Sequence, residues 1–235
     1  MDREVSQMHI IRVEVLRRLA ALAIPLFMAA SVLAQPKNLE EAMSYDGLQK
    51  ITIKGIDMAY ALPGSTLSGY TKVLIDPIGV RFHKDWKPQV TGSRRNLSSS
   101  EQQEIRENVA KIVYEAFVEE LGKGGYSVVT EAGPDVLRVQ ANILNLYITA
   151  PDVMTPGRSV TFTASAGEMT LLAELSDSDS GQIIARVLDR KQARNTDSFQ
   201  ISSRVSNVAE ARNAARAWAK ILRTALDKAK DIGKQ

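Results

Sequence analysis

A histidine and a carboxylate two residues apart form the first candidate for chemistry in this sequence. On a strand, the side chains of His83 and Asp85 would share one face. An imidazole that a carboxylate orients can act as a general base toward a serine hydroxyl. The sequence has no Gly-x-Ser-x-Gly motif to present such a serine. We therefore expect no catalytic residue and a surface ion pair beside Trp86. A hydrolase or small-ligand site at His83, Asp85 and Trp86 is the alternative.

A second candidate is a calcium-binding loop. Asp177, Asp179 and Gly181 have the spacing that opens such a loop. The loop's third acidic position and its closing glutamate are missing, because Gly181 and Leu188 stand there. Aspartate, serine and glycine are also the ordinary residues of tight turns. We therefore expect a turn between two strands and no metal site.

A third candidate is a row of basic residues near the C-terminus, at three- and four-residue spacing: Arg212, Arg216, Lys220 and Arg223. On a helix this spacing places them on one stripe, which we expect to lie opposite the apolar stripe of the same helix. A solvated face is the ordinary explanation of such a stripe. The functional interpretation is a contact surface for an acidic protein partner or for an anionic membrane surface.

The composition excludes several classes of protein. The chain has 235 residues, with 30 Lys and Arg against 27 Asp and Glu, and this net charge of +3 is too small to indicate a nucleic-acid-binding protein. The absence of cysteine excludes disulfides, thiolate metal sites, cysteine nucleophiles and a lipid anchor on cysteine. Two histidines are too few for sites built from several histidines, and we expect no cofactor.

The first 34 residues have the features of a secretory signal peptide. Basic residues precede an uncharged run over 19–34, which is shorter than the about 20 residues of a membrane-spanning helix. Val32 and Ala34 occupy the positions that the signal peptidase reads, so we predict cleavage after Ala34. Met8 is an alternative start to Met1. Export predicts a periplasmic protein, and an uncleaved N-terminal anchor in the inner membrane is the alternative.

The remaining chain is expected to form an irregular arm over 35–69 and one domain over 70–235. Glycine and proline interrupt the arm repeatedly. In the domain, alternating apolar residues predict strands and spacings near 3.6 predict helices. The predicted elements are strands over 72–82, 126–130, 137–148, 160–176 and 182–189, and helices over 98–121 and from Asn207 onward.

Details of these elements indicate how they pack. Ser98 and Glu101 form a capping box at the start of the first helix. The apolar parity of strand 72–82 changes at Asp76-Pro77, which predicts an edge strand or a bulge. Trp218 belongs to the apolar stripe of the last helix and is expected in the core. Both helices can cover one face of the sheet. The fold class is therefore α+β, a two-layer sandwich with a mostly antiparallel sheet of about five strands and two helices on one face, in the order β-α-β-β-β-β-α.

Several short motifs resemble a known bacterial family, the domain of unknown function 3313. They include Lys54-Gly55-Ile56-Asp57, Val73-Leu74-Ile75-Asp76-Pro77, Lys84-Asp85-Trp86 and Asp189-Arg190. The resemblance implies an exported envelope protein, in many members a lipoprotein, and it supplies no activity and no functional residues. This chain departs from the lipoprotein pattern because it has no cysteine. We expect a non-catalytic envelope protein that binds or supports another envelope component.

Overall fold

The computed structural model describes four segments of the chain: 38–87, 96–147, 168–192 and 204–232. The chain divides into two compact units, Met1–Pro36 and Lys37–Gln235. The predicted signal peptide and its cleavage site after Ala34 lie outside the described residues. All structural statements below concern the second unit.

The centre of this unit is a mixed sheet, which is eight-stranded among the described residues. Its strands, from one edge to the other, are β1 (Gln49–Ile51), β2 (Met58–Ala61), β8 (Ile183–Gln192), β7 (Glu168–Asp177), β6 (Val136–Leu146), β3 (Lys72–Ile75) and β5 (Ser127–Val129), with β4 (Gly79–Phe82) also paired to β6. Pairing is antiparallel from β1 through to β6. It is parallel between β6 and both β3 and β4, and between β3 and β5.

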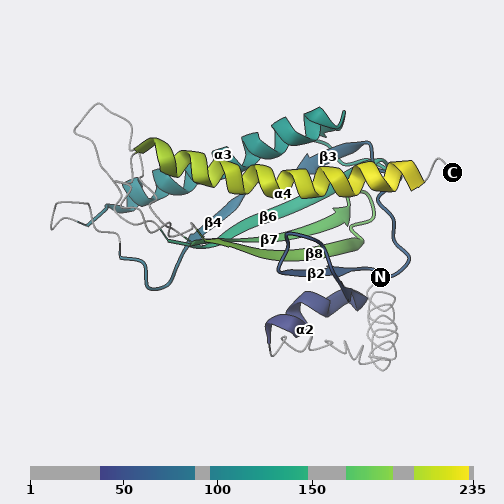
Figure 1. The fold of residues 1–235 in the computed structure, drawn as a ribbon, viewed down its shortest axis with the longest axis horizontal. Coiled ribbons are helices and arrows are strands. Elements are labelled where there is room, and N and C mark those ends of the chain that lie inside the picture. The colour runs from purple at the N-terminus through teal and green to yellow at the C-terminus, as the bar shows by residue number, and fades with distance from the viewer. Residues whose placement is uncertain (1–37, 88–95, 148–167, 193–203, 233–235) are drawn as a thin grey trace, which may run out of the picture. The chain divides into compact units, whose positions relative to one another are not determined.

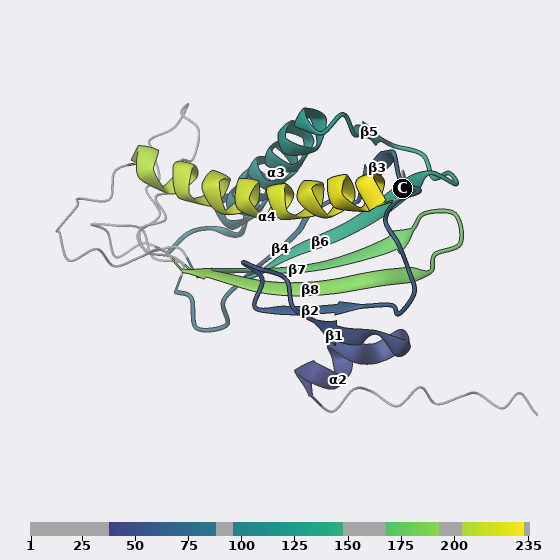
Figure 2. The ribbon, with the colours of Figure 1, turned by 45° about the vertical axis from the view of Figure 1, so that its right-hand side comes forward.

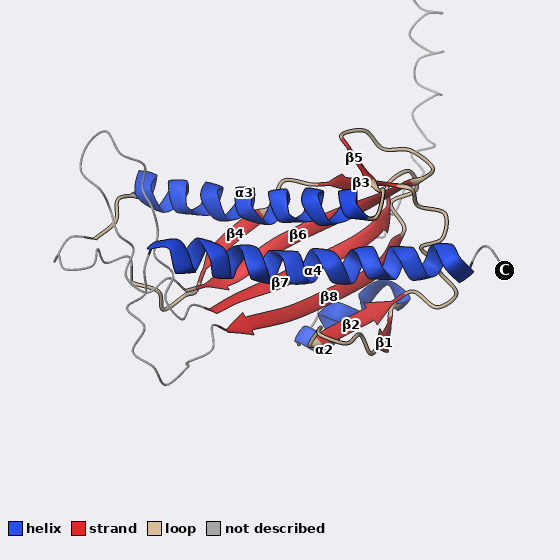
Figure 3. Ribbon diagram, turned by 45° about the horizontal axis from the view of Figure 1, so that its top comes forward, coloured by secondary structure: helices blue, strands red, loops and turns tan. Residues whose placement is uncertain are grey.

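Helices lie on both faces of the sheet. Two long helices, α3 (Ser99–Lys123) and α4 (Arg204–Ile232), run side by side across one face (Figure 1; Figure 3). The opposite face carries α2 (Leu39–Ser44), which continues into the short helix η1 (Tyr45–Gly47) (Figure 2). At the start of α3, Ser98 and Glu101 form the predicted capping box, which satisfies backbone N–H groups that the helix leaves free.

The main core lies between the sheet and the two long helices. Alternate residues of β6 point into it, from Leu137 to Ile143, while the residues between them are more exposed. Trp218 of α4 is only 2% exposed, which confirms its expected place in the core. A smaller cluster around Met43, Leu48 and Tyr60 lies under α2 on the other face.

The sheet differs from the expectation of about five mostly antiparallel strands and two helices. The segment expected to be an irregular arm supplies α2, β1 and β2. The sequence does not indicate these strands, because strands of three or four residues are too short to show a clear alternation. The predicted strand 72–82 is two strands, β3 and β4, and the break falls at the predicted Asp76-Pro77. The start of predicted strand 160–176 lies outside the described residues.

Candidate functional site

The region of His83 lies where β4 ends, beside the end of β6. The rings of Phe82 and Trp86 stack with centroids 4.0 Å apart, and both pack into the main core. His83 stands between them in the sequence and meets the ring of Tyr147 edge-on, with centroids 6.1 Å apart. The backbone N–H of His83 donates to the carbonyl oxygen of Leu146. The structure therefore brings His83 to an aromatic surface at the end of the sheet.

The hydrogen bonding of His83 differs from that of a carboxylate-oriented base. Its Nδ1 accepts a hydrogen bond of 3.1 Å from the backbone N–H of Asp85. The Asp85 carboxylate lies 3.9 Å from the same nitrogen. A carboxylate that orients a catalytic imidazole accepts a hydrogen from Nδ1, whereas here Nδ1 is itself the acceptor. The pair holds the turn after β4 and is not arranged for proton transfer to a serine.

Two of the four basic residues on α4 form ion pairs with α3. Arg216 lies 3.0 Å from the carboxylate of Glu119. Arg223 lies 3.7 Å from the carboxylate of Glu120 and 3.3 Å from that of Asp227 on its own helix. Hydrogen bonds from Arg216 and then from Lys123 lower the pKa of Glu119. The two acidic residues of α3 therefore neutralise much of the basic stripe.

This position corrects the expectation that the stripe lies opposite the core. The basic residues at 212, 216 and 223 each follow a buried residue, at 211, 215 and 222. One residue turns a helix by about 100°, so the stripe occupies the flank beside the core and not its far side. That flank faces α3. Arg212 is half-buried and Lys220 exposed, and neither has a carboxylate partner among the described residues.

A buried carboxylate that was not among the predicted site residues links β8 and α4 to the turn before β2. Asp189 of β8 is 1% exposed and accepts a 2.6 Å hydrogen bond from the indole N–H of Trp218. The ammonium group of Lys191 lies 2.7 Å from the same oxygen. The other carboxylate oxygen of Asp189 accepts a hydrogen bond from the backbone N–H of Asp57. The carboxylate of Asp57 in turn accepts one from the backbone N–H of Arg190. These bonds bring together two of the motifs that carry the family resemblance, and they leave Asp189 a structural role.

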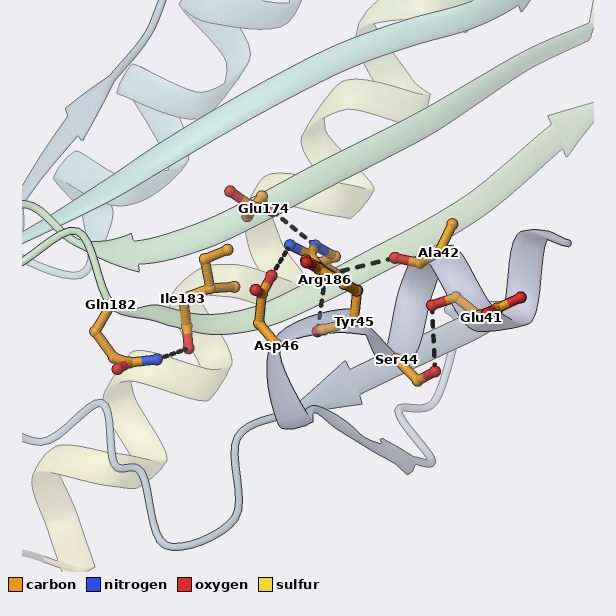
Figure 4. Close-up of polar contacts among 9 residues, drawn as sticks. All are labelled: Glu41, Ala42, Ser44, Tyr45, Asp46, Glu174, Gln182, Ile183 and Arg186. Carbon is orange, nitrogen blue, oxygen red and sulfur yellow. Dashed lines mark hydrogen bonds and ion pairs between the residues drawn. The ribbon is translucent and has the colours of Figure 1, made fainter. Parts of the chain in front are cut away.

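Arg186 forms a second network on the opposite face of the sheet (Figure 4). Its side chain, on β8, is 13% exposed and lies 2.7 Å from Glu174 on β7 and 2.6 Å from Asp46 in η1. It also donates to the carbonyl oxygens of Ala42 and Tyr45. A single guanidinium thus fastens α2 and η1 to the sheet. Asp46 has a φ of 67°, a conformation that aspartate tolerates better than most residues.

The aspartate turn between β7 and β8 uses its own oxygens internally. One oxygen of Asp177 accepts from the backbone N–H and the hydroxyl of Ser180, and the other accepts from the Tyr70 hydroxyl. These bonds, first of all those from Ser180, lower the pKa of Asp177. Burial and the Asp177 hydrogen bond raise the pKa of Tyr70 to about 12. Both oxygens already have donors from the chain, as in a tight turn.

The described part of the chain contains no cluster of three or more histidine, cysteine, aspartate and glutamate side chains that could hold a metal ion. Within the same four segments, no helix combines the length and the apolar character needed to cross a membrane.

Comparison with solved structures gives distant similarities. The PelC dodecamer from Paraburkholderia phytofirmans is 9% identical, with 70% of this chain and 96% of that chain covered and a TM-score of 0.38. A protein of the DUF330 family from Xanthomonas campestris is 10% identical, with 74% and 94% covered and a TM-score of 0.38. A DUF4136 family protein from Bacteroides thetaiotaomicron is 10% identical, with 74% and 98% covered and a TM-score of 0.30. These values assign no function to this chain.

Sequence comparison gives a family. No curated protein matches the chain. The family described as protein of unknown function (DUF3313) matches residues 38–222, which is more than half of the sequence and begins at the residue before α2. The match confirms the resemblance carried by the short motifs, and the chain belongs to the DUF3313 family.

Proposed function

We propose that the chain is an exported, non-catalytic protein of the bacterial envelope that acts by binding another envelope component. The observation that carries this proposal is that the candidate reactive groups serve the fold. Nδ1 of His83 accepts a backbone N–H, both oxygens of Asp177 hold a turn, and Asp189 is buried against Trp218. A catalytic group must instead reach a substrate atom with a hydrogen to give or accept.

Export is supported by the N-terminal sequence. Residues 1–34 combine a basic start, an uncharged middle and small residues before Gln35, which is the pattern of a cleaved signal peptide. A protein outside the cytoplasm has little access to nucleotide cofactors, so a binding role suits this location better than a cofactor-dependent reaction. The absence of cysteine favours a periplasmic form without a lipid on cysteine.

The α4 flank is the proposed contact with an acidic envelope protein. Arg216 and Arg223 already pair with α3, which leaves Arg212 and Lys220 to meet a partner. Long basic side chains at such a position can pair with carboxylates across an interface, and their effect falls with salt. An anionic membrane surface is the other occupant that this charge would suit.

The hydrolase alternative is less well supported than the binding alternative at the same place. A hydrolase would need the hydrogen bonding of His83 to be rearranged, and no serine hydroxyl bonds to its ring among the described residues. A binding module needs only accessible polar and aromatic groups. Exposed Tyr147 and the half-buried His83 beside it are such groups.

Two experiments test the proposal. Mass spectrometry of the protein from the periplasmic fraction should give a chain that begins at Gln35, and an intact leader in the membrane fraction would contradict export. Purification from cross-linked cells should recover a partner with the parent and less of it with Arg212→Gln/Lys220→Gln. The matched control is Lys54→Gln/Lys228→Gln, which removes the same charge elsewhere. Equal recovery with all three proteins would exclude the α4 flank as the contact.

A further inference from the structure

Residues 38–51, which form α2, η1 and β1, lie at the margin of the sheet, and we call them the strap (Figure 2). Met43 and Leu48 are the buried residues of the strap, and they pack with Tyr60 in the smaller apolar cluster. Apart from the pairing of β1 with β2, the strap is held mainly by hydrogen bonds and an ion pair to Arg186. A segment with so few buried apolar side chains opens at a lower free energy than the whole domain.

The strap has a defined end, because the loop that follows it is fastened to β8. The carbonyl oxygen of Gly55 accepts a 3.3 Å hydrogen bond from the ammonium group of Lys191. The backbone N–H of Asp57 donates to β8, and the carboxylate of Asp57 accepts a hydrogen bond from it. These bonds keep the loop and β2 in place when the strap opens. Residues 52–54 are therefore the hinge of the opening.

Opening of the strap turns β2 into an edge strand. The backbone N–H of Leu62, just after β2, donates a 2.8 Å hydrogen bond to the carbonyl oxygen of Ile184 on β8. Backbone groups alternate in direction along an antiparallel strand, so those of Ala59 and Ala61 point the other way, toward β1. Without β1 these groups have no partner strand. Such an edge accepts another strand readily.

We propose that the strap of a second copy of this chain takes the place that the open strap leaves, so that two copies exchange straps and form a dimer. The second strap has the same sequence, so it restores the ion pair with Arg186, the packing of Met43 and the pairing with β2. Exchange of an identical element is a low-cost route to a dimer for this reason. A strand of another protein would have to match all these contacts. The inference goes beyond the proposed function, because it concerns self-association and a surface other than the α4 flank.

Strap exchange gives Arg186 an effect that distinguishes it from ordinary dimerisation. The bonds of Arg186 to the strap exist in the closed monomer and in the exchanged dimer, and they are broken only in the open state. Their removal should therefore speed the exchange and leave the final proportion of dimer unchanged. The closed chain holds its own strap at an effective concentration on the order of millimolar, as for a short linker. The proportion of dimer should therefore rise as the protein concentration approaches that range.

Trapping by engineered cysteines tests the proposal, because the chain has no cysteine of its own. Gln49 of β1 lies opposite Ala61 of β2, and hydrogen-bonded residues of antiparallel strands have Cα atoms about 5.5 Å apart, a separation that a disulfide spans. Two single variants of the exported protein, Gln49→Cys and Ala61→Cys, are mixed in reduced form at high concentration and then oxidised. In the matched control for random collisions, Lys111→Cys on the exposed side of α3 replaces Gln49→Cys. The melting temperature of each variant is compared with that of the parent, so that cross-linking of unfolded protein is recognised.

We expect the test mixture to give about ten-fold more disulfide-linked heterodimer than the control mixture, because strap exchange raises the effective concentration of the two thiols. With Arg186→Ala added to both partners, the heterodimer should form faster and reach the same yield. The double variant Gln49→Cys/Ala61→Cys, oxidised in dilute solution, should close within one chain and stay monomeric when it is concentrated. No excess of heterodimer over the control, with or without Arg186→Ala, would overturn the proposal. A final yield that changes with Arg186→Ala would also contradict strap exchange, because the bonds of Arg186 would then differ between monomer and dimer.

Discussion

The indole N–H of Trp218 donates a 2.6 Å hydrogen bond to the carboxylate of Asp189. Trp218 is on α4 and Asp189 on β8, so this bond joins the helix layer to the sheet. Both residues are buried, and Lys191 supplies a positive charge 2.7 Å from the same carboxylate oxygen. A buried carboxylate is stable only with such partners. The indole N–H and the Lys191 ammonium therefore explain how the Asp189 carboxylate can be buried under α4.

The first prediction concerns this bond. Trp218→Ala should lower the free energy of unfolding by about 3–5 kcal/mol, because it removes a large buried ring. Trp218→Phe should lower the free energy of unfolding by about 1–3 kcal/mol, because an aromatic ring still fills the site but Asp189 loses a hydrogen-bond donor. Urea unfolding measures both, with Tyr114→Ala on the exposed face of α3 as a control within about 0.5 kcal/mol of the parent. Parent-like unfolding of Trp218→Ala would contradict the placement of α4.

The second prediction concerns the fastening of α2. Arg186→Ala should lower the free energy of unfolding by about 2 kcal/mol, because Glu174 and Asp46 would lose the guanidinium between them. Hydrogen exchange should also speed up over residues 38–47, since α2 would be held only by its apolar contacts. Lys50→Gln breaks an exposed pair with Glu40 and should change stability by less than about 0.5 kcal/mol. Unchanged exchange in Arg186→Ala would show that the apolar cluster alone holds α2.

The third prediction concerns stability at high pH. Burial, and after it a hydrogen bond to Asp227, raises the pKa of Tyr126 to about 12, and Tyr70 has a pKa of about 12 beside Asp177. An unfolded tyrosine has a pKa of about 10. Between these values the unfolded chain binds fewer protons than the folded one, so stability is full below about pH 10 and falls toward about pH 12.

Phenolate absorbance measured directly after a jump in pH would follow this titration. Tyr70→Phe and Tyr126→Phe should each remove one of the late-titrating groups and should make the alkaline loss of stability shallower. Loss of a group that titrates near pH 10 in either variant would contradict the hydrogen bonds to Asp177 and Asp227.

The sequence predicted those features of the fold that depend on interactions between neighbouring residues. The capping box at Ser98 and the break at Asp76-Pro77 both follow from neighbouring residues. The parallel pairing of β3 and β4 with β6 joins segments more than 60 residues apart, and no local pattern encodes it. The basic stripe is a different case. Each of its residues follows a core residue by one position in the sequence, and this offset predicts that the stripe lies beside the core and not opposite it.

The two buried networks had a weaker signal in the sequence. Asp189 has the same parity as Ala185 and Val187, which point to the helix side of the sheet, and a charge in that register indicates a buried carboxylate with partners. The partners themselves, such as Trp218, come from another element and depend on the tertiary fold. Arg186 alternates to the other face, and its role depends on α2, which is a single short helix.

The fourth prediction concerns the role of His83. His83→Phe keeps an aromatic ring beside Tyr147 but can neither give nor accept a proton. We expect the folded variant to support cell function as the parent does, because Nδ1 of His83 is occupied by the Asp85 N–H. Complementation of a deletion strain measures this, with melting temperature as the check on folding. A folded variant that failed to complement would favour the hydrolase alternative.

The fifth prediction concerns the charged seam between α3 and α4. Arg216→Glu should lower the free energy of unfolding by about 1–2 kcal/mol, because it replaces an attraction to Glu119 with a repulsion. Lys220→Glu, on the same helix but without a carboxylate partner among the described residues, should change it by less than about 0.5 kcal/mol. The double variant Arg216→Glu/Glu119→Arg restores opposite charges and should recover part of the loss, measured as a coupling energy in urea unfolding. Equal losses in Arg216→Glu and Lys220→Glu, with no coupling to Glu119, would show that the ion pairs between α3 and α4 contribute nothing to stability. All four basic residues of the stripe would then be candidates for the proposed partner contact.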